Sequence, residues 1–139
     1  MPLRCFIQEQ APIPGTAAHP VHYPMCEWVG DEGQVDLRHP LNRWVCSWLT
    51  SDMAELQRCD DVLQVMTQIE DARRSEWFVD GDAFAVDLHA HAVQFNLSHV
   101  TPEDAAYWNQ PDGQFTLPTV KAVLLVWRDF LAVSHSVER

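Results

Sequence analysis

The residues best suited to metal chemistry are two histidines in the second half of the chain. His89 and His91 lie two positions apart, so in a strand they share one face, and Asp87 continues that face. Imidazole and carboxylate groups can ligate zinc or nickel. However, the pair falls where a strand is expected to end, and no further ligands follow at a recognisable spacing. We therefore expect no metal site, and a small metal-binding protein remains the alternative.

Three other side chains have the chemistry needed for catalysis. Cys46 with a histidine base would make a nucleophile, and Asp80 with Asp82 would make a carboxylate pair. Cys46 lies in a helical apolar pattern, where a buried and inert thiol is commoner, and the two acids flank the hairpin residue Gly81 as turn formers. No nucleophile elbow or phosphate-binding loop is present. We expect no enzyme and no cofactor, with a hydrolase that uses His, Asp and Cys residues as the alternative.

The chain is strongly acidic, with 20 Asp and Glu residues against 9 Lys and Arg, and a formal net charge of -11. Nucleic acids and anionic membranes are bound by clustered Lys and Arg, so neither is an expected partner. No run approaches the roughly 18 apolar residues of a membrane span, and the first residues lack the pattern of a secretory signal. The four cysteines form no Cys-x-x-Cys motif, which favours reduced thiols in a cytoplasmic protein.

Hydrophobic periodicity predicts the helices that hold these residues. Apolar side chains recur at helical spacing over 41–49 and again from Asp60 to about Arg74. A third helix, capped by Thr119, is apolar almost all round over 120–131, so we expect it to be the central buried helix. These three helices would provide the cover that a one-sided sheet requires.

Alternation and turn signals predict the strands. The pair Asp80-Gly81 indicates a hairpin, and apolar residues alternate on both sides of it. The expected extended segments are 77–79, 83–88, 93–97 and 115–117, with a further short strand over 3–8. Residues 11–33 are rich in proline and glycine, so we expect an irregular segment there. The resulting prediction is one domain over 1–139 with an α+β fold, an antiparallel β-meander of about three or four strands packed against about three α-helices.

A resemblance to known bacterial proteins covers Glu76 to Leu131. It is carried by the runs Glu-Trp-Phe-Val-Asp-Gly-Asp-Ala-Phe-Ala-Val-Asp-Leu, Val-Gln-Phe-Asn-Leu, Phe-Thr-Leu and Val-Leu-Leu-Val-Trp-Arg-Asp-Phe-Leu. This pattern of strands and aromatic residues is similar to a YacL-like family of small uncharacterised proteins. It also resembles immunity proteins of contact-dependent growth-inhibition systems. The resemblance implies a cytosolic protein that neutralises a cognate toxin domain, often a nuclease, and it transfers no catalytic residue.

The acidic composition and this resemblance together predict a basic protein toxin domain as partner. Lys and Arg are scarce among the acids, so few should be locally paired, and nearby aromatic residues would serve as anchors. The expected partner-binding residues are Asp60, Asp61, Glu70, Asp71, Trp77, Asp80, Asp82 and Asp87. The alternatives are an acidic surface that only confers solubility, and a housekeeping protein with an unknown partner. The six tryptophans fit a monomer or a homodimer.

Overall fold

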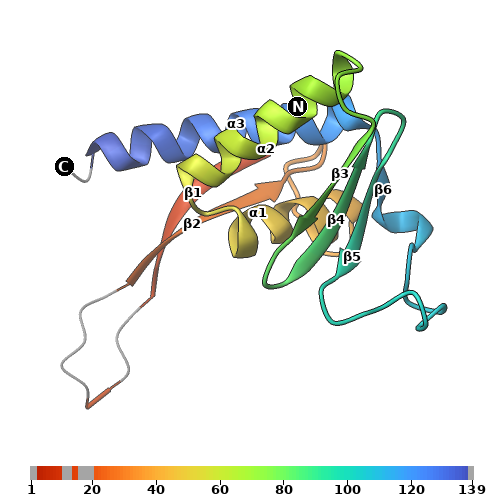
Figure 1. Cartoon of the computed structure of the whole chain (residues 1–139). Coiled ribbons are helices and arrows are strands. Elements are labelled where there is room, and N and C mark those ends of the chain that lie inside the picture. Colours follow the sequence, from red (N-terminus) through yellow and green to blue (C-terminus); the bar gives the residue numbers. More distant parts are fainter. Residues whose placement is uncertain (1–2, 11–13, 16–20, 138–139) are drawn as a thin grey trace.

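Two antiparallel sheets and three α-helices make up the described part of the chain, and the α+β fold class is confirmed (Figure 1). The computed structural model describes residues 3–10, 14–15 and 21–137. The strands are β1 (Leu3–Gln10), β2 (Val21–Trp28), β3 (Glu76–Asp80), β4 (Phe84–His89), β5 (Val93–Leu97) and β6 (Gln114–Phe115). The helices are η1 (Leu41–Cys46, π-helical), α1 (Ser47–Asp52), α2 (Leu56–Glu70), η2 (Pro111–Gly113, 3-10) and α3 (Leu117–Val137). None of the described helices is long and apolar enough to cross a membrane.

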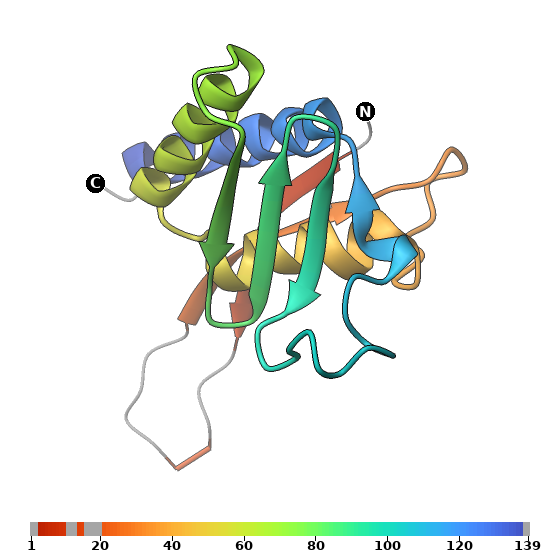
Figure 2. The same cartoon turned by 45° about the vertical axis from the view of Figure 1, so that its right-hand side comes forward.

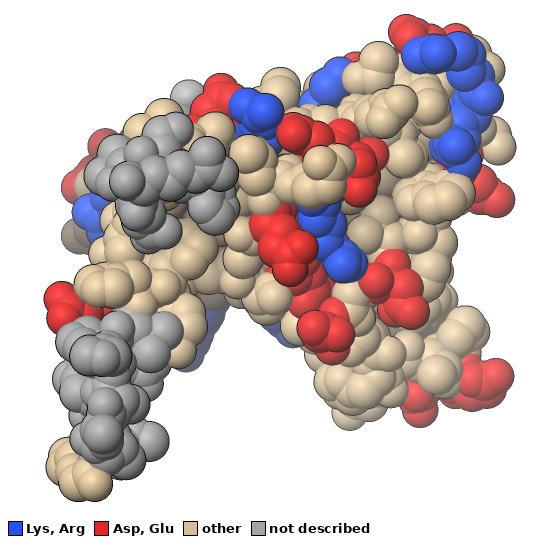
Figure 3. Space-filling model, turned by 60° about the vertical axis from the view of Figure 1, so that its left-hand side comes forward, with Lys and Arg blue, Asp and Glu red and all other residues tan. Residues whose placement is uncertain are grey.

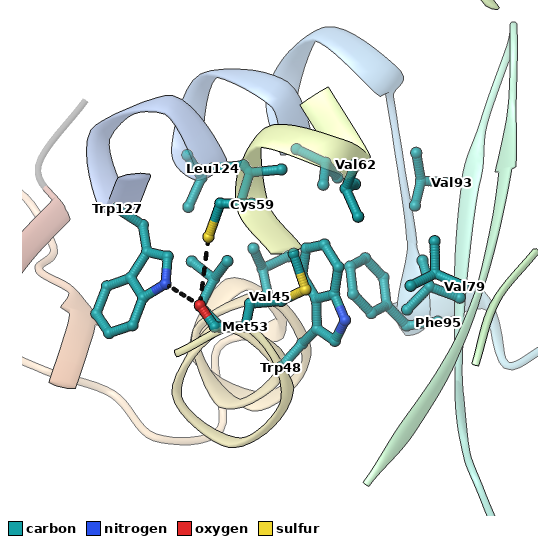
Figure 4. Close-up of a cluster of buried hydrophobic side chains, with 14 of the residues drawn as sticks. Val45, Trp48, Met53, Cys59, Val62, Val79, Val93, Phe95, Leu124 and Trp127 are labelled. Carbon is teal, nitrogen blue, oxygen red and sulfur yellow. Dashed lines mark hydrogen bonds between the residues drawn. The ribbon is translucent and has the colours of Figure 1, made fainter. Parts of the chain in front are cut away.

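The four-stranded sheet is a meander in the order β3-β4-β5-β6. Its inner face points toward the helices, and Val79, Val93 and Phe95 project from it into the core (Figure 4). Figure 2 looks onto the outer face, with α1 and α3 behind the sheet. On that face Asn96 receives a 2.7 Å hydrogen bond from the Asn109 backbone N–H. The segment after β5 therefore covers the β5 side, and the β3–β4 side remains open to solvent.

Buried apolar side chains join the meander to all three α-helices. The rings of Trp48 in α1 and Phe95 in β5 meet edge to face, with centroids 5.4 Å apart. Trp127 in α3 donates a 2.7 Å hydrogen bond from Nε1 to the Met53 carbonyl, and the Cys59 thiol donates to the same oxygen (Figure 4). Because Met53 lies between α1 and α2, one carbonyl ties the three helices together.

A second sheet corrects the prediction of an irregular segment over 11–33. Strand β2 pairs with all of β1 in antiparallel register, from Leu3 opposite Trp28 to Gln10 opposite Val21. Pro24 lies within β2, where a two-stranded ribbon tolerates it because an edge strand does not need every N–H. Residues 11–13 and 16–20 lie outside the described residues. Val35 lies in the turn-rich connection that follows β2.

The helix boundaries differ from the predicted ones by a few residues. The second helix begins at Leu56 rather than Asp60, directly after the chain turns at Met53. The third begins at Leu117, and the Thr116 hydroxyl, not that of Thr119, accepts a 3.3 Å bond from the backbone within its first turn. This helix is also not buried all round. Leu125 and Val126 are 43% and 45% exposed, because α2 and β1 cover only part of its circumference.

Candidate functional site

The open part of the meander carries an apolar side chain surrounded by carboxylates. We define the acidic outer face as Glu76, Phe78 and Asp80 of β3 together with Asp87 of β4. These residues share one face because side chains alternate along a strand, and Phe78 stands directly opposite Asp87 in the register. Phe78 is 48% exposed. The arrangement resembles the anchor and charged rim of a protein interface more than a pocket for a small molecule.

The carboxylates of this face have few cations nearby. Among the described residues, Asp80 and Asp87 form no ion pair with a lysine or arginine, and Glu76 lies 3.4 Å from the Nδ1 of His89. Partial burial raises the pKa of Asp87 and the Glu76 carboxylate raises it further, while His89 acts in the opposite direction. The Arg58 guanidinium reaches one end of this face, where it donates to the Asp80 backbone carbonyl at 3.1 Å, but it forms no ion pair with these carboxylates. The acidic outer face therefore holds negative charge that a cationic partner would relieve.

The helical acids of the predicted interface are instead paired within the chain. Asp60 accepts a 2.8 Å bond from Nε of Arg128, and this guanidinium lowers the pKa of Asp60. Lys121 pairs with Glu70, so two of these bridges join α2 to α3. The expectation that few acids are locally paired is wrong here, because the folded α3 supplies cations distant in sequence. On the face shown in Figure 3, basic side chains accordingly lie between the acidic ones.

The other predicted interface residues are separated in the same way. Asp71 pairs with Arg73 at 3.2 Å, and Asp61 is exposed and accepts a hydrogen bond from Gln57. Asp82 lies exposed in the turn between β3 and β4, next to the acidic outer face. Trp77 projects to the inner side of the sheet edge, 44% exposed, and the Arg74 guanidinium lies 4.5 Å from its ring centroid. The eight predicted residues thus do not form one continuous surface.

The hairpin that presents Asp82 is held by a residue that is not among the eight predicted interface residues. The carboxylate of Asp52, at the end of α1, accepts hydrogen bonds from the backbone N–H groups of Ala83 at 3.0 Å and Phe84 at 2.9 Å. A Cβ at Gly81 would lie 2.4 Å from Oδ2 of Asp52, so only glycine fits there. No local signal marks this contact, because it joins residues about thirty positions apart.

Among the described residues, His89, His91 and Cys46 are not arranged as a metal site or as a nucleophile with its base. His89 faces Glu76, and His91 lies in the turn after β4. Within the described ranges, no three His, Cys, Asp or Glu residues are arranged to hold a metal ion. Cys46 is 4% exposed, and the Cys26 thiol lies 3.8 Å from its carbonyl oxygen. A hydrogen bond from Cys26 lowers the pKa of Cys46, but no histidine of the described residues forms a hydrogen bond with this thiol.

A cavity of about 440 Å³ lies between η1 and the segment that follows β5. Its charged wall groups are engaged within the chain. The Arg43 guanidinium donates to Asp112 at 2.7 Å, and Asp104 accepts from the Thr101 backbone N–H and hydroxyl. Because Arg43 and Asp104 are hydrogen-bonded within the chain, we do not propose this cavity as a catalytic site.

Comparison with protein-family models, with curated proteins and with solved structures found no match to this chain. What the chain does must therefore be inferred from its own surface.

Replacing Asp87 by asparagine is expected to stabilise the protein slightly at neutral pH. A carboxyl whose pKa is raised on folding favours the folded state when protonated, and this contribution is lost as the pH rises through its folded pKa. The substitution removes the unfavourable charge, so it should gain no more than about 1 kcal/mol, since solvent screens a partly exposed group.

Paired thermal unfolding curves of wild type and Asp87→Asn at pH 7 and pH 3 test this. The difference should vanish at pH 3, where the native carboxyl is itself protonated. A variant less stable than wild type at pH 7 would show that Asp87 instead makes a favourable contact.

Proposed function

We propose that this chain is a cytoplasmic immunity protein that binds and neutralises a basic toxin domain through the acidic outer face. The observation that carries the proposal is Phe78, half exposed and flanked by Glu76, Asp80 and Asp87 with no arginine or lysine paired to these acids among the described residues. No catalytic group, metal or cofactor has a part in this function.

The physical basis is an aromatic anchor within a charged rim. A buried aromatic side chain contributes much of the binding energy of a typical interface, and the rim around it excludes water and sets specificity. A nuclease must carry positive charge where it binds nucleic acid, so carboxylates are complementary to the surface that needs to be blocked. Long-range attraction between the two would also speed their association at low salt.

The acids of the meander and those of α2 have different roles in this function, whereas the sequence analysis places both in the interface. Asp80, Asp82 and Asp87 are free to meet a partner, whereas Asp60 and Glu70 serve the packing of α2 against α3. Binding should therefore depend on the meander more than on the helix. This division makes the function testable with matched pairs of substitutions.

The decisive experiment is co-expression with the C-terminal domain of a large secreted protein encoded beside this chain's gene. We expect the wild-type chain to restore growth. The double variant Asp80→Lys/Asp82→Lys should fail to do so, and its association rate with the purified domain should fall about tenfold or more. Association of the wild type should also slow steeply as salt is raised.

The matched control is the double variant Asp31→Lys/Glu32→Lys. It makes the same charge change at two adjacent exposed acids in the connection after β2, which Figure 2 shows on the opposite side of the molecule from β3. This variant should protect as well as the wild type. Equal loss in both double variants would mean that only net charge matters, and absence of a toxin domain beside the gene would contradict the immunity function.

A further inference from the structure

Strand β3 is the edge of the meander, and Figure 2 shows no strand beyond it. An edge strand leaves a row of main-chain donors and acceptors without a partner, which another extended chain can use. Which groups are free depends on the hydrogen-bond phase of the strand.

The turn after β3 defines this phase. Gly81 N–H donates to the Phe84 carbonyl at 2.9 Å, so this is a hydrogen-bonded pair. Such pairs alternate with non-hydrogen-bonded ones along an antiparallel ladder. Counting back from Gly81, Phe78 falls on a non-hydrogen-bonded position, and so both its N–H and its C=O point away from β4.

Two independent contacts agree with this phase. His89 N–H donates to the Ala92 carbonyl at 3.0 Å, which turns every second residue of β4 toward β5 and leaves the others for β3. Asp80, two residues after Phe78, offers its carbonyl outward, where Nη2 of Arg58 donates to it at 3.1 Å. The free edge is therefore centred on Glu76 and Phe78, and Arg58 closes its end.

The side chains along this edge specify the kind of chain that fits. On the outer side, Glu76 and Asp80 flank Phe78, and on the inner side Trp77 exposes 44% of its surface. An added strand would place alternate side chains on these two sides. Basic residues would meet the two carboxylates, and apolar residues would lie beside the Trp77 ring, which the Arg74 guanidinium contacts at 4.5 Å from its centroid. A second copy of this chain would bring like charges together, which opposes self-association through this edge.

We propose that the partner adds an extended segment of alternating basic and apolar residues as a new strand against β3. This rests on the proposed function and names the mode of binding at the same surface. Main-chain hydrogen bonds at Phe78 would supply affinity, and the acids beside it would select a cationic strand.

The probe is an acetylated and amidated heptapeptide of alternating lysine and valine, compared with the same peptide N-methylated at the amides that face β3. Both carry equal charge, but the second cannot donate to the edge. We expect the unmodified peptide to slow hydrogen exchange of the Phe78 amide, and N-methylation to weaken its binding roughly 30- to 150-fold, the cost of two or three net hydrogen bonds. Equal binding of the two peptides, or no binding of either, would overturn the proposal.

Substitution of the protein gives a second test with a control at the same position. Phe78→Pro removes the outward N–H without breaking a bond to β4, and proline is tolerated at edge strands. Phe78→Ala keeps the N–H and loses the ring. Strand addition predicts that Phe78→Pro loses more toxin affinity than Phe78→Ala. If instead Phe78→Pro folds and loses no more toxin affinity than Phe78→Ala, while Asp80→Lys/Asp82→Lys fails to neutralise the toxin, strand addition is wrong and the proposed function stands.

Discussion

Replacing Asp52 by alanine is expected to lower the free energy of unfolding by about 2 to 4 kcal/mol, because it leaves two backbone N–H groups without their charged acceptor. Asp52 is only 9% exposed, and its carboxylate accepts from the N–H groups of Ala83 and Phe84. Urea unfolding followed by tryptophan fluorescence measures the loss. The same contact holds the turn beside Asp82, so the variant should also weaken binding of the partner.

The control for this prediction is Asp61→Ala, which removes the same charge from an exposed position. Asp61 has only a side-chain bond from Gln57, so its loss should cost less than about 0.5 kcal/mol. If both variants lose equal stability, the hydrogen bonds from Ala83 and Phe84 to Asp52 do not stabilise the fold.

The close approach of Gly81 to Asp52 provides a test of the same contact. An added methyl group would lie 2.4 Å from Oδ2 of Asp52, so Gly81→Ala should destabilise the wild type. In the Asp52→Ala background the carboxylate is gone and only the Cβ of residue 52 remains, 3.2 Å from the added methyl group, so most of the cost should disappear. Such non-additivity is the mark of two residues in direct contact. Strictly additive losses would place the strain elsewhere in the turn.

Replacing Trp127 by alanine is expected to cost about 3 to 5 kcal/mol, the usual loss when a large aromatic side chain leaves a packed core. The ring is fully buried in α3, and its Nε1 donates to the Met53 carbonyl at 2.7 Å. Because this carbonyl lies where α1 gives way to α2, the variant should loosen all three helices. Calorimetry or urea unfolding measures the effect.

Comparison of Trp127→Phe with Trp48→Phe separates the hydrogen bond from the packing. Both side chains are fully buried, but Nε1 of Trp48 has no hydrogen-bond partner among the described residues. Trp127→Phe should therefore be the more costly by about 1 kcal/mol, the net value of one hydrogen bond. Equal losses would indicate that the Met53 contact adds nothing to stability.

Patterns within about ten residues of one another were enough to predict much of the fold. The stripe from Leu41 to Leu49 does form a helix, and the alternation around Asp80-Gly81 does form a meander. The pairing of β1 with β2 was missed because its partners are joined by a segment whose prolines and glycines resemble a loop. The exposed side of α3 was missed because apolar composition does not report how many neighbours an element has.

The candidate site shows the same division. Membership of Phe78 and Asp80 on one face follows from strand periodicity, which depends only on neighbouring residues. The pairing of Asp60 with Arg128 joins positions 68 apart in the chain, and no spacing rule reaches that far. The acids of α2 and those of the meander looked equivalent in sequence, and the packing of α3 made them different.

The amino-acid sequence by itself determined that this protein is an acidic α+β chain with a meander and a surplus of carboxylates. Those properties follow from composition and short-range periodicity, which depend only on residues close together in the sequence. Only the tertiary structure decided which carboxylates are neutralised and which surround Phe78 at an open sheet edge. The physical reason is that a charge is compensated by its neighbours in space, and folding chooses those neighbours from distant parts of the chain.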